Sequence, residues 1–110
     1  MPVFMYELAY TAESLAAQMK APADRIETVA KPAAEAAGGK LVGGWYSFGD
    51  FDLVLILDMP DVESMAGVAI AVGAGGAVRA GRTTPLMTGQ QAVAGFRKAS
   101  AVAATYRPAR

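Results

Sequence analysis

The reactive side chains of this 110-residue protein are limited because it contains no cysteine and no histidine. This excludes disulfides, thiolate ligands and a cysteine nucleophile, together with the commonest general base and the commonest ligand for transition metals. Carboxylates, lysines, tyrosines and hydroxyl groups remain. We predict neither a metal site nor a cofactor.

Glu7 is the carboxylate best placed for acid–base chemistry. It stands alone among the apolar residues of the segment Val3–Tyr10, and burial in an apolar interior would give it the raised pKa of a general base. The alternative is an ion pair with Arg79 or Arg82 on an adjacent strand, which we favour. Glu7 is therefore the catalytic candidate, with a structural role as its main competitor.

Two aspartates flank Phe51 at a turn between apolar segments. Asp50 and Asp52 could hold a hard cation or share one proton. Turn geometry at Asp50 and a hydrogen bond at the start of a strand for Asp52 would explain both residues without a ligand. We favour this structural interpretation and keep Asp52 among the candidate binding residues.

Aromatic side chains could line a ligand pocket. Trp45 and Tyr46 are adjacent in a predicted strand, so they point to opposite faces. One of them could join Tyr6 and Tyr10 in a pocket between the sheet and a partner subunit. Packing in the core is the default role of all four side chains.

Charge is divided unevenly along the chain, although the formal net charge is zero. Residues 1–63 hold ten acidic and four basic residues, whereas residues 64–110 hold six basic residues and no acidic one. Arg79 and Arg82 are expected on opposite faces of one strand, so one of them could contact an anionic ligand; solvation at the surface is the alternative. Six bases with few aromatic residues among them do not form a nucleic-acid surface, and we predict no nucleic-acid partner.

The elements that must position these residues follow from the spacing of apolar and turn residues. Pro22 and Pro32 are expected to break or kink the first helical region, and Gly43 and Gly44 indicate a bulge. The expected strands are residues 3–10, 41–48, 51–59 and 78–86. The expected helices are residues 11–37 with interruptions, 62–72, and 88–105, the last opening with a capping box at Thr88 and Gln91.

This order predicts an α+β fold of ferredoxin-like βαββαβ topology, with an antiparallel four-stranded sheet and an extra C-terminal helix. We expect one domain, in which residues 1–88 form the ferredoxin-like part and residues 89–110 its C-terminal helix and tail. The strand at 51–59 is apolar on both faces, while two helices can cover only one face of the sheet. A second copy of the chain is expected to cover the other face; the alternative is that the C-terminal helix folds back over it.

A family resemblance supports this fold. The segment Tyr46-Ser-Phe-Gly-Asp-Phe-Asp-Leu-Val54, preceded by Gly38-Gly-Lys-Leu41 and followed by Pro60-Asp61, resembles the GYD domain family. The resemblance extends over residues 3–88 and implies a dimeric α/β barrel. Phe51 stands where the family signature Gly-x-Tyr-Asp has tyrosine, so any role of that hydroxyl is absent from this chain.

Three functions remain open. We favour a homo-oligomeric domain that binds a small molecule, with anionic metabolites as candidate ligands. The alternatives are an enzyme similar to the cofactor-independent monooxygenases or isomerases of this superfamily, with Glu7 or a tyrosine as proton carrier, and a structural assembly module. The N-terminus does not resemble a signal peptide and the longest uncharged run is too short to span a bilayer, so we expect a cytoplasmic protein without a membrane partner.

Overall fold

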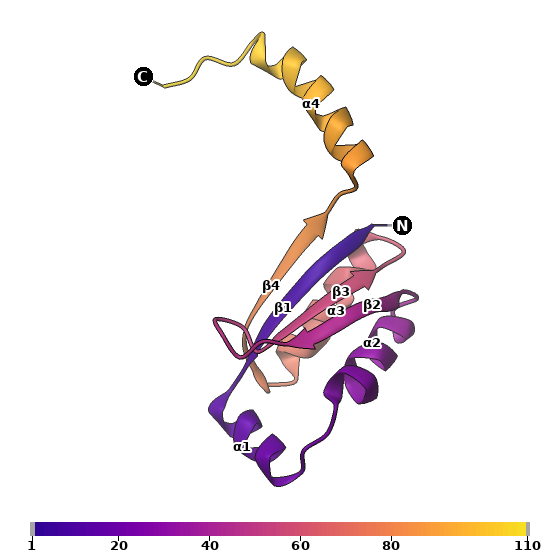
Figure 1. Ribbon diagram of the computed structural model, residues 1–110, viewed down its shortest axis with the longest axis vertical. Coiled ribbons are helices and arrows are strands. Elements are labelled where there is room, and N and C mark those ends of the chain that lie inside the picture. Colours follow the sequence, from indigo (N-terminus) through magenta and orange to yellow (C-terminus); the bar gives the residue numbers. More distant parts are fainter. Residues whose placement is uncertain (1, 110) are drawn as a thin grey trace.

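The computed structural model describes residues 2–109 as one antiparallel sheet with helices on one face and a C-terminal helix beyond its end (Figure 1). The strands are β1 (Val3–Tyr10), β2 (Lys40–Tyr46), β3 (Leu53–Asp58) and β4 (Val78–Leu86). The helices are α1 (Ala12–Lys20), the π-helical turn η1 (Ile26–Ala30), α2 (Lys31–Ala36), α3 (Val62–Ala74) and α4 (Gly89–Ala103).

The sheet has the strand order β2-β3-β1-β4, and every pairing is antiparallel. This confirms the α+β ferredoxin-like order βαββαβ with an extra C-terminal helix. The hairpin strands are shorter than expected, because the residues between Tyr46 and Leu53 form a loop instead of extended strand. The Ser47 N–H donates to the Asp52 carbonyl at 2.9 Å and the Gly49 N–H to the Phe51 carbonyl at 3.0 Å.

The first helical region is interrupted at Pro22, as the sequence predicts, whereas η1 and α2 follow each other without a gap at Pro32. α1 ends at Lys20, just before Pro22, and the chain becomes helical again only at η1. Pro32 lies in the first turn of α2, where a missing backbone N–H is tolerated best. The break lets η1 and α2 leave the direction of α1 and lie along the sheet (Figure 1).

The predicted bulge in β2 is also confirmed. The pairing of β2 with β3 shifts register between Leu41 and Gly43. Beyond the bulge, Trp45 pairs with Val54 on one face and Tyr46 with Leu53 on the other. Gly44 allows close packing here, since a Cβ at this position would lie only 3.0 Å from Ile26 Cγ2 and 2.9 Å from Leu55 Cδ2.

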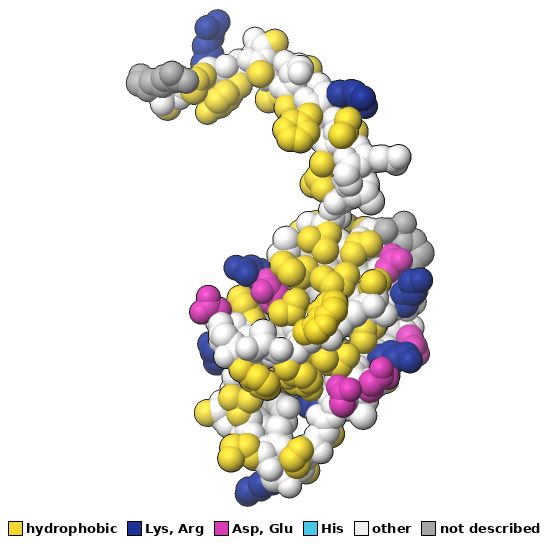
Figure 2. Space-filling view, viewed as in Figure 1, with side chains coloured by type: hydrophobic (Ala, Val, Ile, Leu, Met, Phe, Trp, Pro, Cys, Tyr) yellow, Lys and Arg dark blue, Asp and Glu magenta, His cyan; other side chains and the backbone are white. Residues whose placement is uncertain are grey.

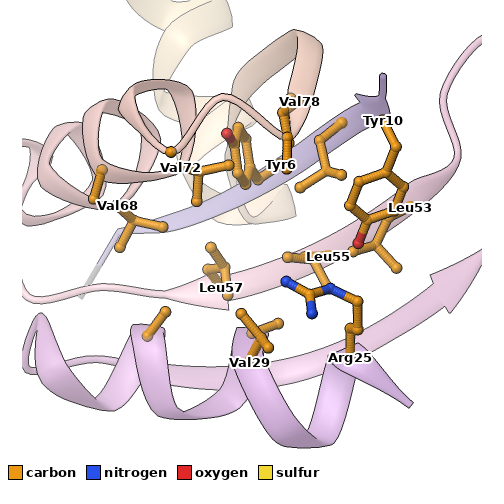
Figure 3. Close-up of a pocket in the computed structure, with 16 residues that line it drawn as sticks. Tyr6, Tyr10, Arg25, Val29, Leu53, Leu55, Leu57, Val68, Val72 and Val78 are labelled. Carbon is orange, nitrogen blue, oxygen red and sulfur yellow. The ribbon is translucent and has the colours of Figure 1, made fainter. Parts of the chain in front are cut away.

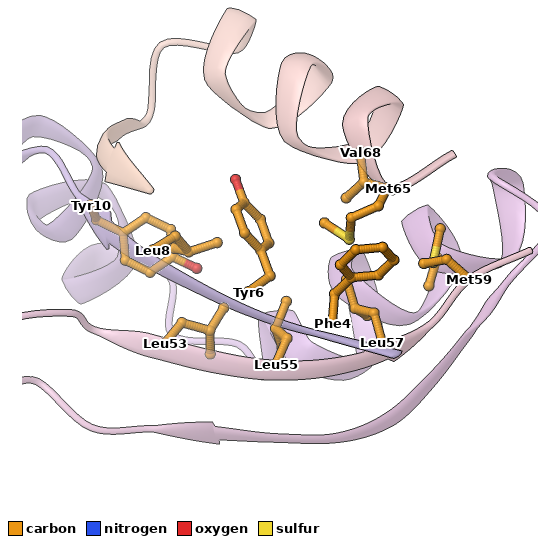
Figure 4. Close-up of a cluster of buried hydrophobic side chains, with 11 residues drawn as sticks. Phe4, Tyr6, Leu8, Tyr10, Leu53, Leu55, Leu57, Met59, Met65 and Val68 are labelled. Carbon is orange, nitrogen blue, oxygen red and sulfur yellow. The ribbon is translucent and has the colours of Figure 1, made fainter. Parts of the chain in front are cut away.

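The hydrophobic core lies between the sheet and the helices. Alternate residues of β1 and β3 point toward η1, α2 and α3, and all of them are buried (Figure 4). We call this the covered face. Its core side chains are Phe4, Tyr6, Leu8, Tyr10, Leu53, Leu55 and Leu57, packed with Ala34, Met59, Met65 and Val68.

The other face of the sheet, which we call the open face, has no helix over it within residues 2–109 (Figure 1). Met5 pairs with Ile56 and Glu7 with Val54 on this face, and all four side chains are half-buried. Trp45 at its edge is 61% exposed. Figure 2 shows hydrophobic side chains gathered over this side of the sheet, so its surface is largely apolar.

α4 stands away from the sheet and does not cover the open face (Figure 1). The described chain measures 58 × 35 × 22 Å, and its radius of gyration of 17.4 Å exceeds the value of about 13 Å that a compact domain of this length has. The alternative, in which the C-terminal helix folds back over the open face of its own sheet, is therefore not seen. α4 is nevertheless a capped helix, with the predicted capping box between Thr88 and Gln91 present.

Candidate ligand-binding site

A cavity of about 350 Å³ lies between the covered face of the sheet and its helices (Figure 3). We call it the helix–sheet cavity. β1 and β3 provide its floor through Tyr6, Leu8, Tyr10, Leu53, Leu55 and Leu57. The walls come from η1, α2, α3 and the start of β4 through Arg25, Val29, Ala30, Ala33, Val68, Ala71, Val72, Gly75, Ala77 and Val78.

Short side chains on the walls explain why the space is not filled. Ala30 and Ala33 face the floor from one side, and Ala71 and Ala77 from the other. The cavity is partly open to solvent, since Val29, Ala71 and Gly75 in its walls are exposed. The alternating apolar pattern of β1 and β3 makes its floor hydrophobic.

Arg25 is the one charged residue among those that line the cavity. It lies immediately before η1, and its backbone N–H donates to the Tyr46 hydroxyl at 3.0 Å. This bond fixes the start of η1 against β2. The Arg25 side chain extends into the cavity toward the Tyr10 hydroxyl (Figure 3).

The floor of the cavity contains two tyrosines, of which Tyr10 lies near this cation. Burial raises the pKa of Tyr6 above its ordinary value of 10.0. Burial also raises the pKa of Tyr10, and this effect outweighs the opposing hydrogen bond with Arg25. Both phenols therefore stay protonated at neutral pH. The Tyr10 hydroxyl lies near the Arg25 cation in an apolar setting, whereas the Tyr6 hydroxyl lies beside Gly81 of β4.

Glu7 lies on the other side of the sheet and forms the predicted ion pair. Arg82 Nε and Nη2 donate to Glu7 Oε1 at 3.1 and 3.0 Å. The Arg82 guanidinium also lies over the Phe51 ring, with its Cζ atom 5.0 Å from the ring centroid. The Glu7 carboxylate is thus held on the open face, away from the helix–sheet cavity.

Asp52 has the structural role that the sequence favours. Its Oδ2 atom accepts the Tyr10 backbone N–H at 2.8 Å, and its own N–H donates to the Leu8 carbonyl at 2.8 Å. The side chain is buried, whereas Asp50 is exposed. Within residues 2–109 no group of three or more acidic residues is arranged to hold a metal ion.

The structure does not bring the predicted binding residues together in one site. Tyr6 and Tyr10 line the cavity, but from beneath the protein's own helices instead of facing a partner subunit. Tyr46 supports the cavity through Arg25, and Trp45 lies on the open face. The remaining three lie elsewhere: Asp52 at the hairpin loop, Arg79 exposed at the start of β4, and Arg82 on the open face.

Arg25 is the site residue that the sequence analysis missed. It follows Pro22 and Asp24 and directly precedes the apolar helical positions Ile26 and Val29. A single base at the start of a helix whose apolar side faces a sheet is the available signal. The signal is incomplete, because only the path of the chain after Pro22 brings Arg25 over Tyr10.

A comparison with protein-family models matches the GYD domain over residues 4–94. This chain belongs to the GYD domain family. The match covers the sheet except for Val3, the elements around the helix–sheet cavity and the first part of α4. A search of curated proteins and a search of solved structures each gave no match.

The residues that correspond to the family motif, Gly49 to Asp52, lie in the hairpin loop between β2 and β3. In this GYD domain the loop holds Phe51 against Arg82 on the open face and Asp52 against the end of β1. The motif therefore has a structural role in this chain, beside the cavity and not within it. None of the helices between residues 2 and 109 has the length and hydrophobicity needed to cross a membrane.

Proposed function

We propose that this GYD domain binds a small molecule with an apolar body and an anionic group in the helix–sheet cavity. The observation that supports it most is the position of Arg25 beside the Tyr10 hydroxyl in an otherwise apolar cavity. A guanidinium can donate two parallel N–H bonds to a carboxylate or phosphate. The apolar floor and walls would bury the remainder of the ligand.

The size of the cavity favours a compact ligand. A volume of about 350 Å³ lies toward the small end of the range, roughly 300–1,000 Å³, found for ligand pockets. Small aromatic or short aliphatic acids suit such a space. The leucines of β3 and the valines of α3 would contact their carbon atoms, and the anionic group would point toward η1.

Two observations favour binding over proton-transfer catalysis. Glu7, the carboxylate candidate for a general base, is paired with Arg82 on the open face. Tyr6 and Tyr10 have raised pKa values, so neither is ionised at neutral pH to act as a base. A purely structural assembly module, in turn, would not need an apolar cavity lined by a single cationic residue.

Calorimetric titration with a panel of small aromatic and aliphatic carboxylates, each compared with its neutral amide, tests this proposal. We expect at least one acid to bind, its amide to bind at least about tenfold more weakly, and Arg25→Gln to remove that difference. Arg79→Gln is the matched control, because it removes the same charge from an exposed position outside the cavity. Amides that bind as well as their acids, or equal effects of the two variants, would contradict the proposal.

We also propose that the open face is covered by a second copy of the chain. Met5, Val54 and Ile56 give this face an apolar centre, and Trp45 extends it to the sheet edge. Removing several hundred Å² of such surface from water contributes several kcal/mol at roughly 25 cal/mol per Å². A sheet-to-sheet homodimer would satisfy this requirement.

Sedimentation velocity over a range of micromolar concentrations tests the homodimer. Ile56→Lys should shift the protein toward monomers, whereas Val62→Lys should not, because Val62 is an exposed residue at the start of α3 on the helix side. Wild-type protein that sediments only as a monomer would refute the homodimer and leave the ligand-binding proposal intact.

A further inference from the structure

α4 and the segment that follows it present hydrophobic side chains that their own subunit does not cover. Phe96 is 75% exposed and Val93, Val102 and Tyr106 are also exposed. Ala92, Ala99 and Ala103 lie on the same side as Phe96, because they follow the helical spacing of three and four residues. α4 is therefore an amphipathic helix whose apolar side faces water.

A helix of this kind needs a partner to be stable. α4 has 15 residues, and isolated helices of about this length are marginal in water even with good helix-forming residues. Its capping box satisfies backbone groups at the first turn, which helps the helix to form but does not bury its apolar side. Packing against another surface would supply the missing stabilisation.

The distribution of charge indicates what that surface is. Residues 89–110 hold four basic residues and no acidic one, whereas residues 1–88 hold ten acidic and six basic residues. The helix and tail are thus positive and the rest of the chain is negative. This opposition favours contact between α4 and the GYD fold and disfavours pairing of two α4 helices.

Trp45 and Val42 of β2 offer an apolar counterpart. They are 61% and 60% exposed, and Trp45 lies at the edge of the open face. The Trp45 indole lies over Gly43, where a Cβ would come within 2.8 Å of the ring. α4 of the same subunit is directed away from this edge (Figure 1), so a second copy is the source of a helix that could reach it.

We propose that α4 of one copy packs on the β2 edge of the open face of a second copy, around Trp45 and Val42. The two copies would exchange their C-terminal helices, and Phe96 would lie against the exposed aromatic edge of the partner's sheet. This inference rests on the self-association proposed above and is independent of the ligand site.

A membrane surface is the competing partner for a basic amphipathic helix, and the composition of α4 argues against it. Residues 89–110 contain no Leu, Ile, Met or Trp, the residues that anchor interfacial helices best. The stripe beside Phe96 consists mainly of alanine, which permits close approach to another protein surface. The second copy therefore fits better than a lipid bilayer.

Fluorescence quenching between two different copies tests the exchange directly, because the chain has one tryptophan and no cysteine. One chain carries Trp45→Phe and a nitroxide quencher on Ala99→Cys; the other is unmodified, so its Trp45 is the only tryptophan in the mixture and can be excited selectively. Mixing the two should produce a saturable loss of Trp45 emission. The control label on Ala101→Cys, on the opposite side of α4, should quench less.

Several outcomes would overturn the exchange. Sedimentation that shows dimers without quenching between copies would refute the helix exchange and leave the sheet homodimer standing, whereas monomers alone would refute both. Quenching confined to a chain that carries both Trp45 and the label at position 99 would show fold-back within one subunit. Cosedimentation of unmodified protein with phosphatidylglycerol-containing vesicles, without quenching between copies, would assign α4 to membranes.

A pair of charge substitutions gives a second measurement that does not involve labels. Phe96→Glu should weaken dimerisation by at least about tenfold, as expected for an aromatic residue at the centre of an interface. Ala101→Glu introduces the same charge into the same helix on its other side and should change the dissociation constant by less than about threefold. Equal effects of the two variants would contradict the proposed contact.

Discussion

The covered and open faces of the sheet are built from alternate residues of the same strands, but their surroundings differ. On the covered face, Leu57 and its neighbours pack against helices of their own subunit and enclose a cavity. On the open face, Ile56 and Met5 have no helix above them within residues 2–109. The covered face is packed by helices of its own chain, whereas the open face has no helix over it within residues 2–109.

The arginines on the two sides of the sheet also differ in their surroundings. Arg25 and Tyr10 on the covered face meet inside an apolar cavity without a carboxylate among the lining residues. Arg82 on the open face is already neutralised by Glu7. Of these two arginines, only Arg82 forms an ion pair among residues 2–109.

The largest expected effect comes from truncating neighbouring residues of β3 on opposite faces. Leu57→Ala should lower the free energy of unfolding by about 2–5 kcal/mol, because Leu57 is 1% exposed. Ile56→Ala should cost roughly half as much in dilute solution, since its side chain is only half-buried. Urea denaturation at two protein concentrations measures both changes.

Concentration separates the two faces further. The cost of Ile56→Ala should grow with protein concentration as the second copy covers the open face, while the cost of Leu57→Ala should stay constant. Parallel behaviour of the two variants at every concentration would mean that both faces are completed within one chain.

Removing the carboxylate of Asp52 should have the next largest effect. Asp52→Asn weakens the bond to the buried Tyr10 N–H, and we expect a loss of about 1–3 kcal/mol in the free energy of unfolding. Asp50→Asn, two residues away and exposed, should change stability by less than about 0.5 kcal/mol. Chemical denaturation distinguishes the two, and comparable losses would rule out a special role for Asp52.

The fold could be predicted closely from the sequence because its signals are local. Alternation in β1 and β3, the prolines at 22 and 32 and the caps at Asp61 and Thr88 each act within a few residues. These signals set the element order, with strand ends shifted only where the loop between Tyr46 and Leu53 closes on itself.

The candidate site was predicted only in part because it depends on contacts distant in sequence. The alternation of side chains along β1 places Tyr6 and Tyr10 on one face of the sheet and Glu7 on the other. It does not indicate which of the two faces the helices cover. The role of Arg25 depends on how η1 crosses the sheet after Pro22. The apolar side of α4 was visible in the sequence, whereas its direction away from the sheet was not.

The ion pair on the open face should contribute less than the buried groups. Glu7→Gln is expected to lower the free energy of unfolding by about 1 kcal/mol or less, since the Arg82 side chain is 61% exposed. A double-mutant cycle with Arg82→Gln isolates the energy of the pair. A more stable Glu7→Gln variant would instead indicate that the carboxylate is strained for a functional reason.

Ionisation of the two cavity tyrosines, Tyr6 and Tyr10, should leave the free energy of unfolding unchanged at neutral pH and lower it at basic pH. Because burial raises their pKa values in the folded state, the folded protein retains these protons more tightly than the unfolded chain. Stability is therefore unaffected below the ordinary pKa of 10.0 and falls as the pH rises above it. Thermal unfolding at increasing pH, compared with Tyr6→Phe, checks this; an identical decline in the variant would exclude Tyr6 as its cause.

The hairpin loop imposes a restriction on length. It is closed by a hydrogen bond from Ser47 to Asp52. Asp52 also joins the loop to β1 through Tyr10 and Leu8, and Phe51 contacts Arg82. Inserting or deleting one residue here would displace both Asp52 from Tyr10 and Phe51 from Arg82. Variation in related chains should therefore take the form of substitutions at this loop, with gaps confined to other turns.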